Sequence, residues 1–334
     1  MTVSVVVPAY QASAHLGACL AALRSSTYPP REIIVVDDGS TDSTPGVAAQ
    51  AHAKYVRIPD GPRGPAAARN VGARCAEADV LLFVDADVAV HADTIARIAG
   101  HLERHPDLAA VFGSYDDQPT DGGIISRYRN LLHHFVHQHS AQEASTFWAG
   151  CGAVRRETFL AAGGFDERYR RPSIEDIELG DRLWRAGHRI RLCPDVQVRH
   201  MKEWTLGRVL RTDVFARAIP WSRLMLAQRR VPRDLNTSLA SRWGALAAWL
   251  IVLAAFGGIF AAEWLWLAAA GVLVLCALNA PLYSFFVRRG GAAFAAAAVV
   301  LHGLYLLYSS AVFGAVAAAT WLARARASLS RVPN

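Results

Sequence analysis

Residues 80–90 read VLLFVDADVAV, and this stretch decides the fold that we expect for the first part of the chain. The apolar run Val80–Val84 is typical of a β-strand buried on both faces, as in a sheet covered by helices on both sides. Two carboxylates, Asp85 and Asp87, then follow one residue apart. A buried carboxylate without a partner is strongly unfavourable, so a positive group is expected opposite this pair.

Short β-branched runs alternate with Ala-rich stretches of helical spacing up to about residue 115. Strands separated by helices imply an α/β fold with a mostly parallel sheet, whose ligands bind at the carboxyl ends of the strands. The expected strands are Ser4–Val7, Ile33–Val36, Tyr55–Ile58, Val80–Val84 and Leu108–Phe112, and the expected helices are His15–Leu23, Ala66–Ala76 and Thr94–Glu103. Further helices are expected within 127–139, 155–167 and 173–187.

Charged residues are distributed very unevenly along the 334 residues. Between Trp243 and Leu322 only Glu263, Arg288 and Arg289 carry charge, whereas the first 242 residues have the composition of a soluble protein. We therefore expect a soluble domain followed by a membrane domain. The net charge of +7 suits anionic partners, namely nucleotides, phospholipid head groups or nucleic acid.

Three apolar spans follow Arg242, and each reaches the roughly 18–20 residues that a bilayer requires. Tryptophans lie near their ends, as interface aromatics do. Arginines before the first span and between the second and third would be cytoplasmic, whereas Arg324 and Arg326 would lie outside. The spans are Trp243–Phe260, Trp264–Val287 and Ala292–Trp321.

A basic amphipathic segment precedes the spans. Apolar residues from Leu206 to Met225 follow helical spacing, and the opposite face carries Arg208, Arg211, Arg217 and Arg223. This pattern is typical of a helix in the membrane interface, and the alternative is a helix packed on the soluble domain. The expected parts are a catalytic domain at 1–203, the interface helix and linker at 204–242, a transmembrane domain at 243–322 and a tail at 323–334.

The N-terminus and the cysteines bear on location. The N-terminal MTVSVVVPAYQ has no basic region, and its apolar run is short for a signal peptide. We therefore expect the catalytic domain to stay in the cytoplasm and the spans to anchor it in the cytoplasmic membrane. The five scattered cysteines form no C-x-x-C pair, which argues against a disulfide framework and against a zinc site.

Two further motifs favour a nucleotide ligand. In VVDDGSTD, residues 35–42, a carboxylate at the end of a strand can accept from the edge of a nucleobase, or it can cap the next helix. In GPRGPAAARNVG, residues 61–72, Arg69 lies beside a phosphate or a base, or it is a solvated arginine. Neither the P-loop pattern nor G-x-G-x-x-G occurs in the chain, which excludes those nucleotide sites.

If the chain stays extended after Val84, the strand period places Asp85 and Asp87 on the same side. Two oxygen ligands at the end of a strand suit Mg²⁺ or Mn²⁺, and the alternative is a solvated pair of acids in a loop. His200 is either a third metal ligand or a packed or capping side chain. Asp176, in the first turn of a helix, either stabilises the helix dipole or acts as a general base.

These motifs together resemble the family 2 glycosyltransferases, which have the Rossmann-like GT-A fold. VSVVVPAYQ, VVDDGSTD, ARNVG, FVDAD, AGGFDE and EDIELGDRLWRAG occur in family order over roughly residues 3–200. The resemblance implies that Pro8, Ala9, Tyr10 and Asp38 line the nucleobase and ribose pocket and that Arg69 sits by the nucleotide. It also implies that Asp85 contacts ribose or metal, that Asp87 and His200 bind the metal, and that Asp176 is the catalytic base.

The reaction implied by the resemblance is an inverting transfer from a UDP- or GDP-linked sugar. GDRLWRAG stands where processive polysaccharide synthases have Q-x-x-R-W, which favours transfer of a single sugar. The apolar spans favour a lipid or lipid-linked hydroxyl acceptor at the bilayer, and no nucleic-acid partner is expected. The alternatives are a polyprenyl-phosphate sugar synthase, a processive polysaccharide synthase, and a membrane transporter or scaffold without activity.

Overall fold

The structure, a computed structural model, describes residues 1–232 and 235–329 and divides after Trp204 into two units. A sheet with strand order β3-β2-β1-β4-β8-β6-β9-β5 forms the centre of the first unit, and β7 pairs with β9. The strands are β1 Val3–Ala9, β2 Glu32–Asp37, β3 Lys54–Arg57, β4 Val80–Val84, β5 Val88–Val90, β6 Leu108–Tyr115, β7 Glu143–Ala144, β8 Cys151–Arg155 and β9 Arg189–His200.

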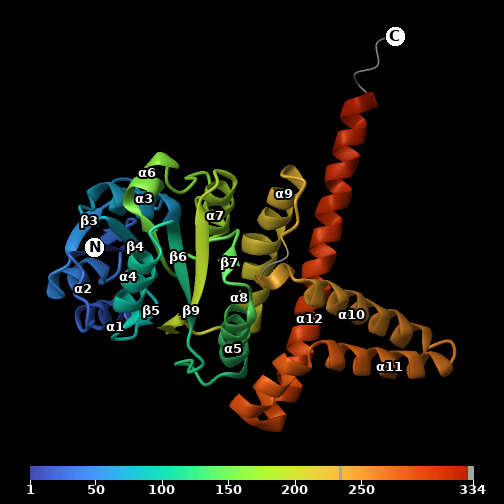
Figure 1. Cartoon of the computed structure of the whole chain (residues 1–334). Coiled ribbons are helices and arrows are strands. Elements are labelled where there is room, and N and C mark those ends of the chain that lie inside the picture. The colour runs from blue at the N-terminus through green and yellow to red at the C-terminus, as the bar shows by residue number, and fades with distance from the viewer. Residues whose placement is uncertain (233–234, 330–334) are drawn as a thin grey trace. The chain divides into compact units, whose positions relative to one another are not determined.

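Helices lie on both faces of this sheet (Figure 1), as the apolar run of residues 80–84 predicts. All five residues of β4 are buried, and α3 packs on β1 and β2. Every strand and helix expected in this unit is present, with ends shifted by a few residues. The helices are α1 Ser13–Arg24, α2 Thr44–Gln50, α3 Pro65–Cys75, α4 Thr94–Arg104, α5 Ile124–His139, α6 Arg156–Ala161 and α7 Glu175–Arg185.

The sheet is parallel on one side and mixed on the other. Strands β3, β2, β1 and β4 are parallel, whereas β8 pairs antiparallel with both β4 and β6. The expectation of a mostly parallel sheet therefore holds for β1 to β4, whereas the complete sheet is mixed. The sequence of β8, CGAVR, contains a single β-branched residue, so it lacks the run that marks the expected strands.

The chain turns directly after β4. The N–H of Val88 donates to the carbonyl of Asp85 at 3.0 Å, and β5 then pairs with the end of β9 in a register that places Val88 opposite His200. The N–H of Met201 donates to the carbonyl of Asp87 at 2.9 Å. The chain therefore does not stay extended through Asp85 and Asp87, so the condition for both side chains to share one side of a strand is not met, and His200 lies beside Asp87.

The second unit is helical wherever the structure describes regular elements. The helices α8, η1 and α9 follow one another directly, and η1 is a π-helix. The helices η1 and α9 pack against α12, where the hydroxyl of Tyr308 donates to Asp213 at 2.5 Å and Arg324 donates to the carbonyl of Leu226 at 3.4 Å. The helices are α8 Leu206–Arg211, η1 Thr212–Ala218, α9 Ile219–Ala227, η2 Leu235–Thr237, α10 Leu239–Gly257, α11 Glu263–Leu278 and α12 Ala280–Leu329.

Two helices of this unit, α10 and α12, are long and apolar enough to cross a membrane. The expected span Trp264–Val287 is interrupted, since α11 ends at Leu278 and the amide of Asn279 donates to the carbonyl of Leu275 at 2.9 Å. Gly291, with φ +77°, then breaks the regular geometry of α12. The prediction of a continuous second span is therefore wrong, because α11 and α12 are separate helices and Pro281, which has no backbone N–H, follows the break directly.

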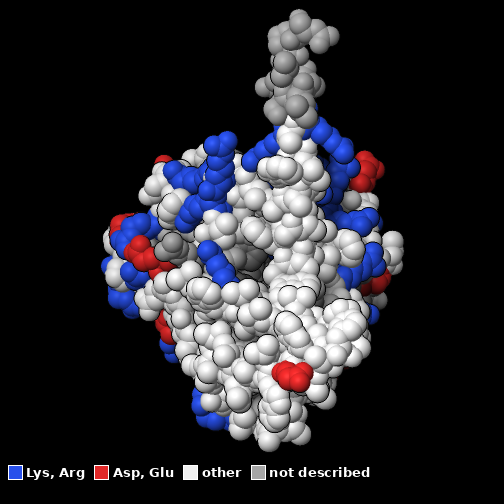
Figure 2. Space-filling view, turned by 90° about the vertical axis from the view of Figure 1, so that its right-hand side faces the viewer, with Lys and Arg blue, Asp and Glu red and all other residues white. Residues whose placement is uncertain are grey.

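Basic residues gather at one end of the second unit. Arg324 donates to the carbonyl of Leu226, which lies three residues before Arg229, so the two arginines are close together rather than on opposite sides as expected. Exposed apolar side chains of α10, α11 and α12 form a broad surface with few charged residues, part of which Figure 2 shows. This surface has the character of one that faces lipid rather than water.

Gly180 allows α7 to lie directly against the backbone that precedes β8. A Cβ atom at this position would lie 2.2 Å from the backbone nitrogen of Phe147. We predict that Gly180→Ala lowers the thermal unfolding midpoint of the full chain in detergent micelles by roughly 2–12 °C, because overpacking of this kind costs about 1–3 kcal/mol. Differential scanning fluorimetry measures the shift.

Gly46→Ala is the matched control, because no atom lies within 4 Å of a Cβ built at this position in α2. Its midpoint should stay equal or rise slightly, since alanine favours the helix over glycine. If Gly180→Ala unfolded at the wild-type temperature, the close packing of α7 would not be a constraint on the fold.

Candidate active site

A buried arginine joins the end of β4 to the start of α7. Arg69, on α3, donates from Nη2 to Oδ1 of Asp85 at 2.7 Å and from Nη1 to Oε1 of Glu175 at 2.9 Å. Burial lowers the pKa of Arg69, the charges of Asp85 and Glu175 raise it, and the net shift is upward. The positive group expected opposite the two aspartates is therefore, for Asp85, this arginine. Only 5% of Arg69 is exposed, and its guanidinium is bonded to these two carboxylates. Contact between Arg69 and a nucleotide stays a prediction.

Asp176 lies next to Glu175 but has different partners. Its Oδ2 accepts from the N–H of Ala149 at 3.1 Å, and its Oδ1 accepts from the N–H of Ile177 at 2.8 Å. Burial raises the pKa of Asp176 to about 6, the charge of Glu175 adds to the rise, and Arg69 and the two N–H donors oppose it. A carboxylate whose pKa lies near neutrality is suited to take a proton from a substrate.

Asp87 lies between an imidazole and an ammonium group. Its Oδ2 is 3.8 Å from Nε2 of His200 and 3.7 Å from Nζ of Lys202. Two ligands of one Mg²⁺ ion, each about 2.1 Å from it, lie roughly 3.0–4.2 Å apart in octahedral geometry. The carboxylate and imidazole of Asp87 and His200 therefore fit a divalent cation in chemistry and in spacing.

Asp85 has a different partner from Asp87. Its Oδ1 is held by Arg69, and the turn after β4 separates its partners from those of Asp87. Among the described residues, the group of three ligand-type side chains with all ligand atoms within 4.8 Å is His101, Cys193 and Asp195, not the Asp85–Asp87 pair with His200. Each acid therefore lies near its own protein cation, and a metal role for Asp85 stays a prediction.

The end of β2 carries two buried aspartates that shape a loop. Asp38 Oδ1 accepts from the N–H of Arg63, and its Oδ2 accepts from the N–H of Gly64, both at 2.7 Å. The loop lies so close that a Cβ on Gly61 would be 2.5 Å from the carbonyl oxygen of Asp38. Each carboxylate oxygen keeps a second lone pair, so Asp38 can still accept from a ligand.

The residues expected around the nucleobase lie together at the ends of β1 and β2. The N–H of Asp38 donates to the carbonyl of Ala9 at 2.9 Å. Pro8 is half-buried and Ala9 is buried, whereas the side chain of Tyr10 is 51% exposed at the mouth of this edge. An exposed aromatic ring next to buried acceptors suits the stacking and edge recognition of a base.

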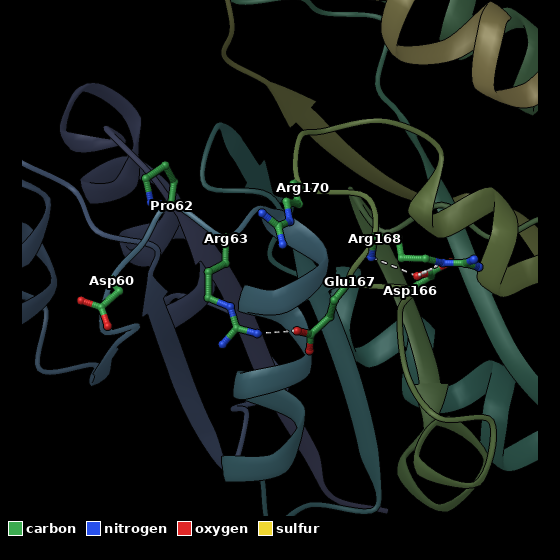
Figure 3. A pocket seen from close by; sticks show the side chains of 7 residues that line it. All are labelled: Asp60, Pro62, Arg63, Asp166, Glu167, Arg168 and Arg170. Carbon is green, nitrogen blue, oxygen red and sulfur yellow. Dashed lines mark hydrogen bonds and ion pairs between the residues drawn. The ribbon is translucent and has the colours of Figure 1, made fainter.

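A cavity of about 660 Å³ opens beside the loop that Asp38 holds (Figure 3). Arg63 and Glu167 form an ion pair across it at 2.8 Å, and Arg168 pairs with Asp166 at 2.7 Å. Acids and arginines are present in equal number in its lining, so the cavity has no strong net preference for an anion. Its lining residues are Asp60, Pro62, Arg63, Asp166, Glu167, Arg168 and Arg170.

Three residues of this region were not assigned a role by their sequence pattern alone. In the sequence, Glu175 is one of the acids in the first turn of a helix, where it would stabilise the helix dipole. Only the structure shows that it is the partner of the buried Arg69. Lys202 is one of two lysines in the chain, which is a weak signal. Asn130 is buried in the middle of α5, and a buried polar residue with poor helix propensity is a sign that could have drawn attention to it.

Family models match most of the first unit. The model described as "Glycosyl transferase family 2" matches residues 4–163, and the model described as "N-terminal domain of galactosyltransferase" matches residues 129–204. N-acetylglucosaminyl-diphospho-decaprenol L-rhamnosyltransferase of Mycobacterium tuberculosis is 30% identical over 240 residues, which cover 61% of this chain and 77% of that protein. Pre-mycofactocin glycosyltransferase of the same organism is 29% identical and covers 75% of this chain and 52% of its own length.

Solved structures confirm the expected fold. Mannosyltransferase PcManGT from Pyrobaculum calidifontis, in complex with GDP-Man and Mn²⁺, is 22% identical, covers 95% of this chain and 86% of its own, and has a TM-score of 0.56. S. aureus TarS 1-349, in complex with UDP-GlcNAc, is 20% identical, covers 67% of this chain and 64% of its own, and has a TM-score of 0.53.

We predict that Arg69→Met strongly destabilises the first unit. The substitution leaves Asp85 and the buried Glu175 without their cation, and breaking a buried pair costs about 3–5 kcal/mol. The thermal midpoint of the full chain in detergent should fall by roughly 6–20 °C. Arg69→Met combined with Glu175→Gln should recover part of this loss, because one buried charge is then absent.

Arg31→Met is the surface control for this pair of variants. Arg31 pairs with Glu77 at 3.0 Å, and both side chains are more than half exposed, so the midpoint should change little. Equal midpoints for Arg69→Met and Arg31→Met would contradict the role of Arg69 as the link between β4 and α7.

Proposed function

Because the chain belongs to glycosyl transferase family 2, we propose that it transfers one sugar, with inversion, from a nucleoside diphosphate sugar to a hydroxyl of a lipid or lipid-linked acceptor. The observation that carries the proposal is the Asp176 carboxyl, whose pKa is raised to about 6 beside the buried Arg69 network. A base of this kind matches an acceptor that must lose a proton when it attacks.

In the proposed reaction, Asp176 accepts the proton of the acceptor hydroxyl as its oxygen attacks the anomeric carbon. The bond from that carbon to the diphosphate breaks, and the diphosphate leaves with the electron pair. The N–H groups of Ala149 and Ile177 hold the carboxylate in place, so it is oriented before the substrate arrives. Asp87 and His200 would hold Mg²⁺ or Mn²⁺, which neutralises charge on the leaving diphosphate when bound.

The donor nucleotide is proposed to bind along the ends of β1, β2 and β4. Tyr10 would stack on the base, with Pro8 and Ala9 beneath it, and Asp38 would accept from the base or the ribose. Asp85, whose Oδ1 is fixed by Arg69, would contact the ribose through its other oxygen. Two solved structures of similar fold are complexes with GDP-Man and with UDP-GlcNAc, and we propose a donor of one of these two classes.

The acceptor is proposed to lie in a membrane. The two long apolar helices α10 and α12 and the exposed apolar surface around them support anchoring in the cytoplasmic membrane, with the catalytic unit on the cytoplasmic side. The mycobacterial relative is named as a rhamnosyltransferase for a diphospho-decaprenol acceptor. A polyprenyl-phosphate sugar synthase is disfavoured, because a phosphate acceptor is already an anion and needs no base such as Asp176.

We predict that turnover of the wild-type chain rises as pH increases through about 6 and is constant above it, because Asp176 must be ionised to accept a proton. Asp176→Asn should lower turnover by about 10²–10⁴-fold while binding of the donor is retained. Titration of turnover against pH and of donor affinity by calorimetry measures both effects.

Asp181→Asn, on the same helix, is the control acid, since Asp181 lies 3.4 Å from Arg185 rather than near Ala149. Its turnover and pH profile should equal those of the wild type. A wild-type pH profile for Asp176→Asn would remove this residue as the base.

The proposed substrates are tested by incubating the full chain in detergent with UDP- and GDP-sugars, Mn²⁺ and a membrane lipid extract. We expect nucleoside diphosphate to be released with one donor, and only when lipid is added. Release with a polyprenyl phosphate as the sole acceptor would favour the synthase, and no release with any donor would favour a scaffold or transporter. Asp176→Asn should abolish the lipid-dependent release.

A further inference from the structure

His200 is held by a second side chain on the ring nitrogen that faces away from Asp87. Its Nδ1 lies 3.0 Å from Oδ1 of Asn130, which projects from α5. His200 is 5% exposed and Asn130 is 2% exposed, so water does not compete freely for this hydrogen bond. The pair joins α5 to the end of β9, two elements far apart in the sequence.

We propose that Asn130 is a positioning residue that fixes the tautomer of His200 and so directs the lone pair of Nε2 toward Asp87. An amide oxygen can only accept, so Nδ1 must carry the proton and donate it. A neutral imidazole has one N–H, and Nε2 is then the nitrogen able to bind a cation. The proposal rests on the metal-dependent transfer proposed above, and it names the residue that positions one of the two expected metal ligands.

The hydrogen bond to Asn130 determines which ring nitrogen of His200 faces Asp87, and packing alone does not determine this. Tyr115 stacks on His200 with ring centroids 4.4 Å apart and an interplanar angle of 20°. Stacking fixes the plane of the imidazole, but it does not distinguish the ring from one turned by 180° about the Cβ–Cγ bond. The hydrogen bond to Asn130 makes that distinction, because only one orientation brings Nδ1 to the amide oxygen.

The backbone places the other half of the site. The register of β5 against β9 sets Val88 opposite His200, and Met201 donates to the carbonyl of Asp87. With the strands fixed, Nε2 lies 3.8 Å from Oδ2 of Asp87, a separation that two ligands of one divalent ion can adopt. A partner on the remote nitrogen of a metal-binding histidine typically changes metal affinity by about 10–100-fold.

Lys202 lies at the same carboxylate of Asp87 and would compete with a metal cation for it. Its Nζ lies 3.7 Å from Oδ2 of Asp87 and 5.0 Å from the centroid of the Trp204 ring. The ammonium thus balances the carboxylate and has an aromatic face to which it can move. Removal of Lys202 should therefore strengthen cation binding, whereas removal of Asn130 should weaken it.

The test measures Mn²⁺ binding to the full chain in detergent micelles, by the electron paramagnetic resonance signal of free Mn²⁺. Asn130→Leu keeps a similar volume but has no acceptor, so its affinity should fall by about 10–100-fold. Asn130→Asp still accepts from Nδ1 and should bind within a few-fold of the wild type. Gln138→Leu is the control on the same helix, because Gln138 donates to the carbonyl of Pro194, and its affinity should not change.

A second measurement reports the tautomer without metal. In protein labelled with ¹⁵N-histidine, the His200 resonances, assigned by their absence in His200→Gln, should show a protonated Nδ1 in the wild type. This preference should be lost in Asn130→Leu and kept in Asn130→Asp. A protonated Nε2 in the wild type, or wild-type Mn²⁺ affinity in folded Asn130→Leu, would overturn the proposal.

The two readouts separate this proposal from the proposed function. The tautomer is measured without donor, acceptor or metal. The result therefore tests the role of Asn130 regardless of which reaction the chain catalyses. Asp87→Ala should abolish the Mn²⁺ affinity that depends on Asn130, and Lys202→Met should increase it. Equal Mn²⁺ affinity for Asp87→Ala and wild type would remove the site itself, and with it the role of Asn130.

Discussion

The buried guanidinium of Arg69 is the interaction on which the active-site edge of the first unit depends. It links a carboxylate at the end of β4 with one at the start of α7, and within the described parts of the chain neither acid has another cation within hydrogen-bond reach. Because buried charges are tolerated only in pairs with good geometry, α3, β4 and α7 are held at one distance. The position of Asp176 follows from this constraint, since it is the next residue along α7 after Glu175.

Much of the first unit could be predicted, because hydrophobic periodicity and turn residues act locally. The strands at Val3–Ala9 and Val80–Val84 and the helix Glu175–Arg185 follow directly from their patterns. Strand β8 could not be predicted, because Cys151-Gly152-Ala153 has little β propensity of its own and is a strand only through pairing with its neighbours. The partners of Asp85 and Asp87 were also out of reach, since a turn, not a continued strand, decides where the two carboxylates point.

The second unit shows a different limit. Average hydropathy predicts that the segment is apolar, and the structure has α10 and α12 long enough to cross a membrane. Hydropathy does not report where a helix ends, because the break between α11 and α12 depends on Asn279, whose backbone is not helical, and on Pro281, which lacks the N–H that a continued helix requires. The packing of η1 and α9 on α12, which includes the hydrogen bonds of Tyr308 with Asp213 and of Arg324 with Leu226, is likewise not reported by hydropathy.

Two pairs of neighbouring acids in this chain divide their roles in the same way. In each pair one carboxylate, Asp85 or Glu175, is neutralised by Arg69, and its neighbour, Asp87 or Asp176, has other partners. The division follows from electrostatics, because two adjacent carboxylates at a buried edge are tolerated when a cation compensates one of them. The second acid of each pair then keeps lone pairs for chemistry. In these two pairs the position of Arg69 decides which carboxylate it neutralises, and the neighbouring acid, Asp87 or Asp176, is the one for which we propose metal binding or proton transfer.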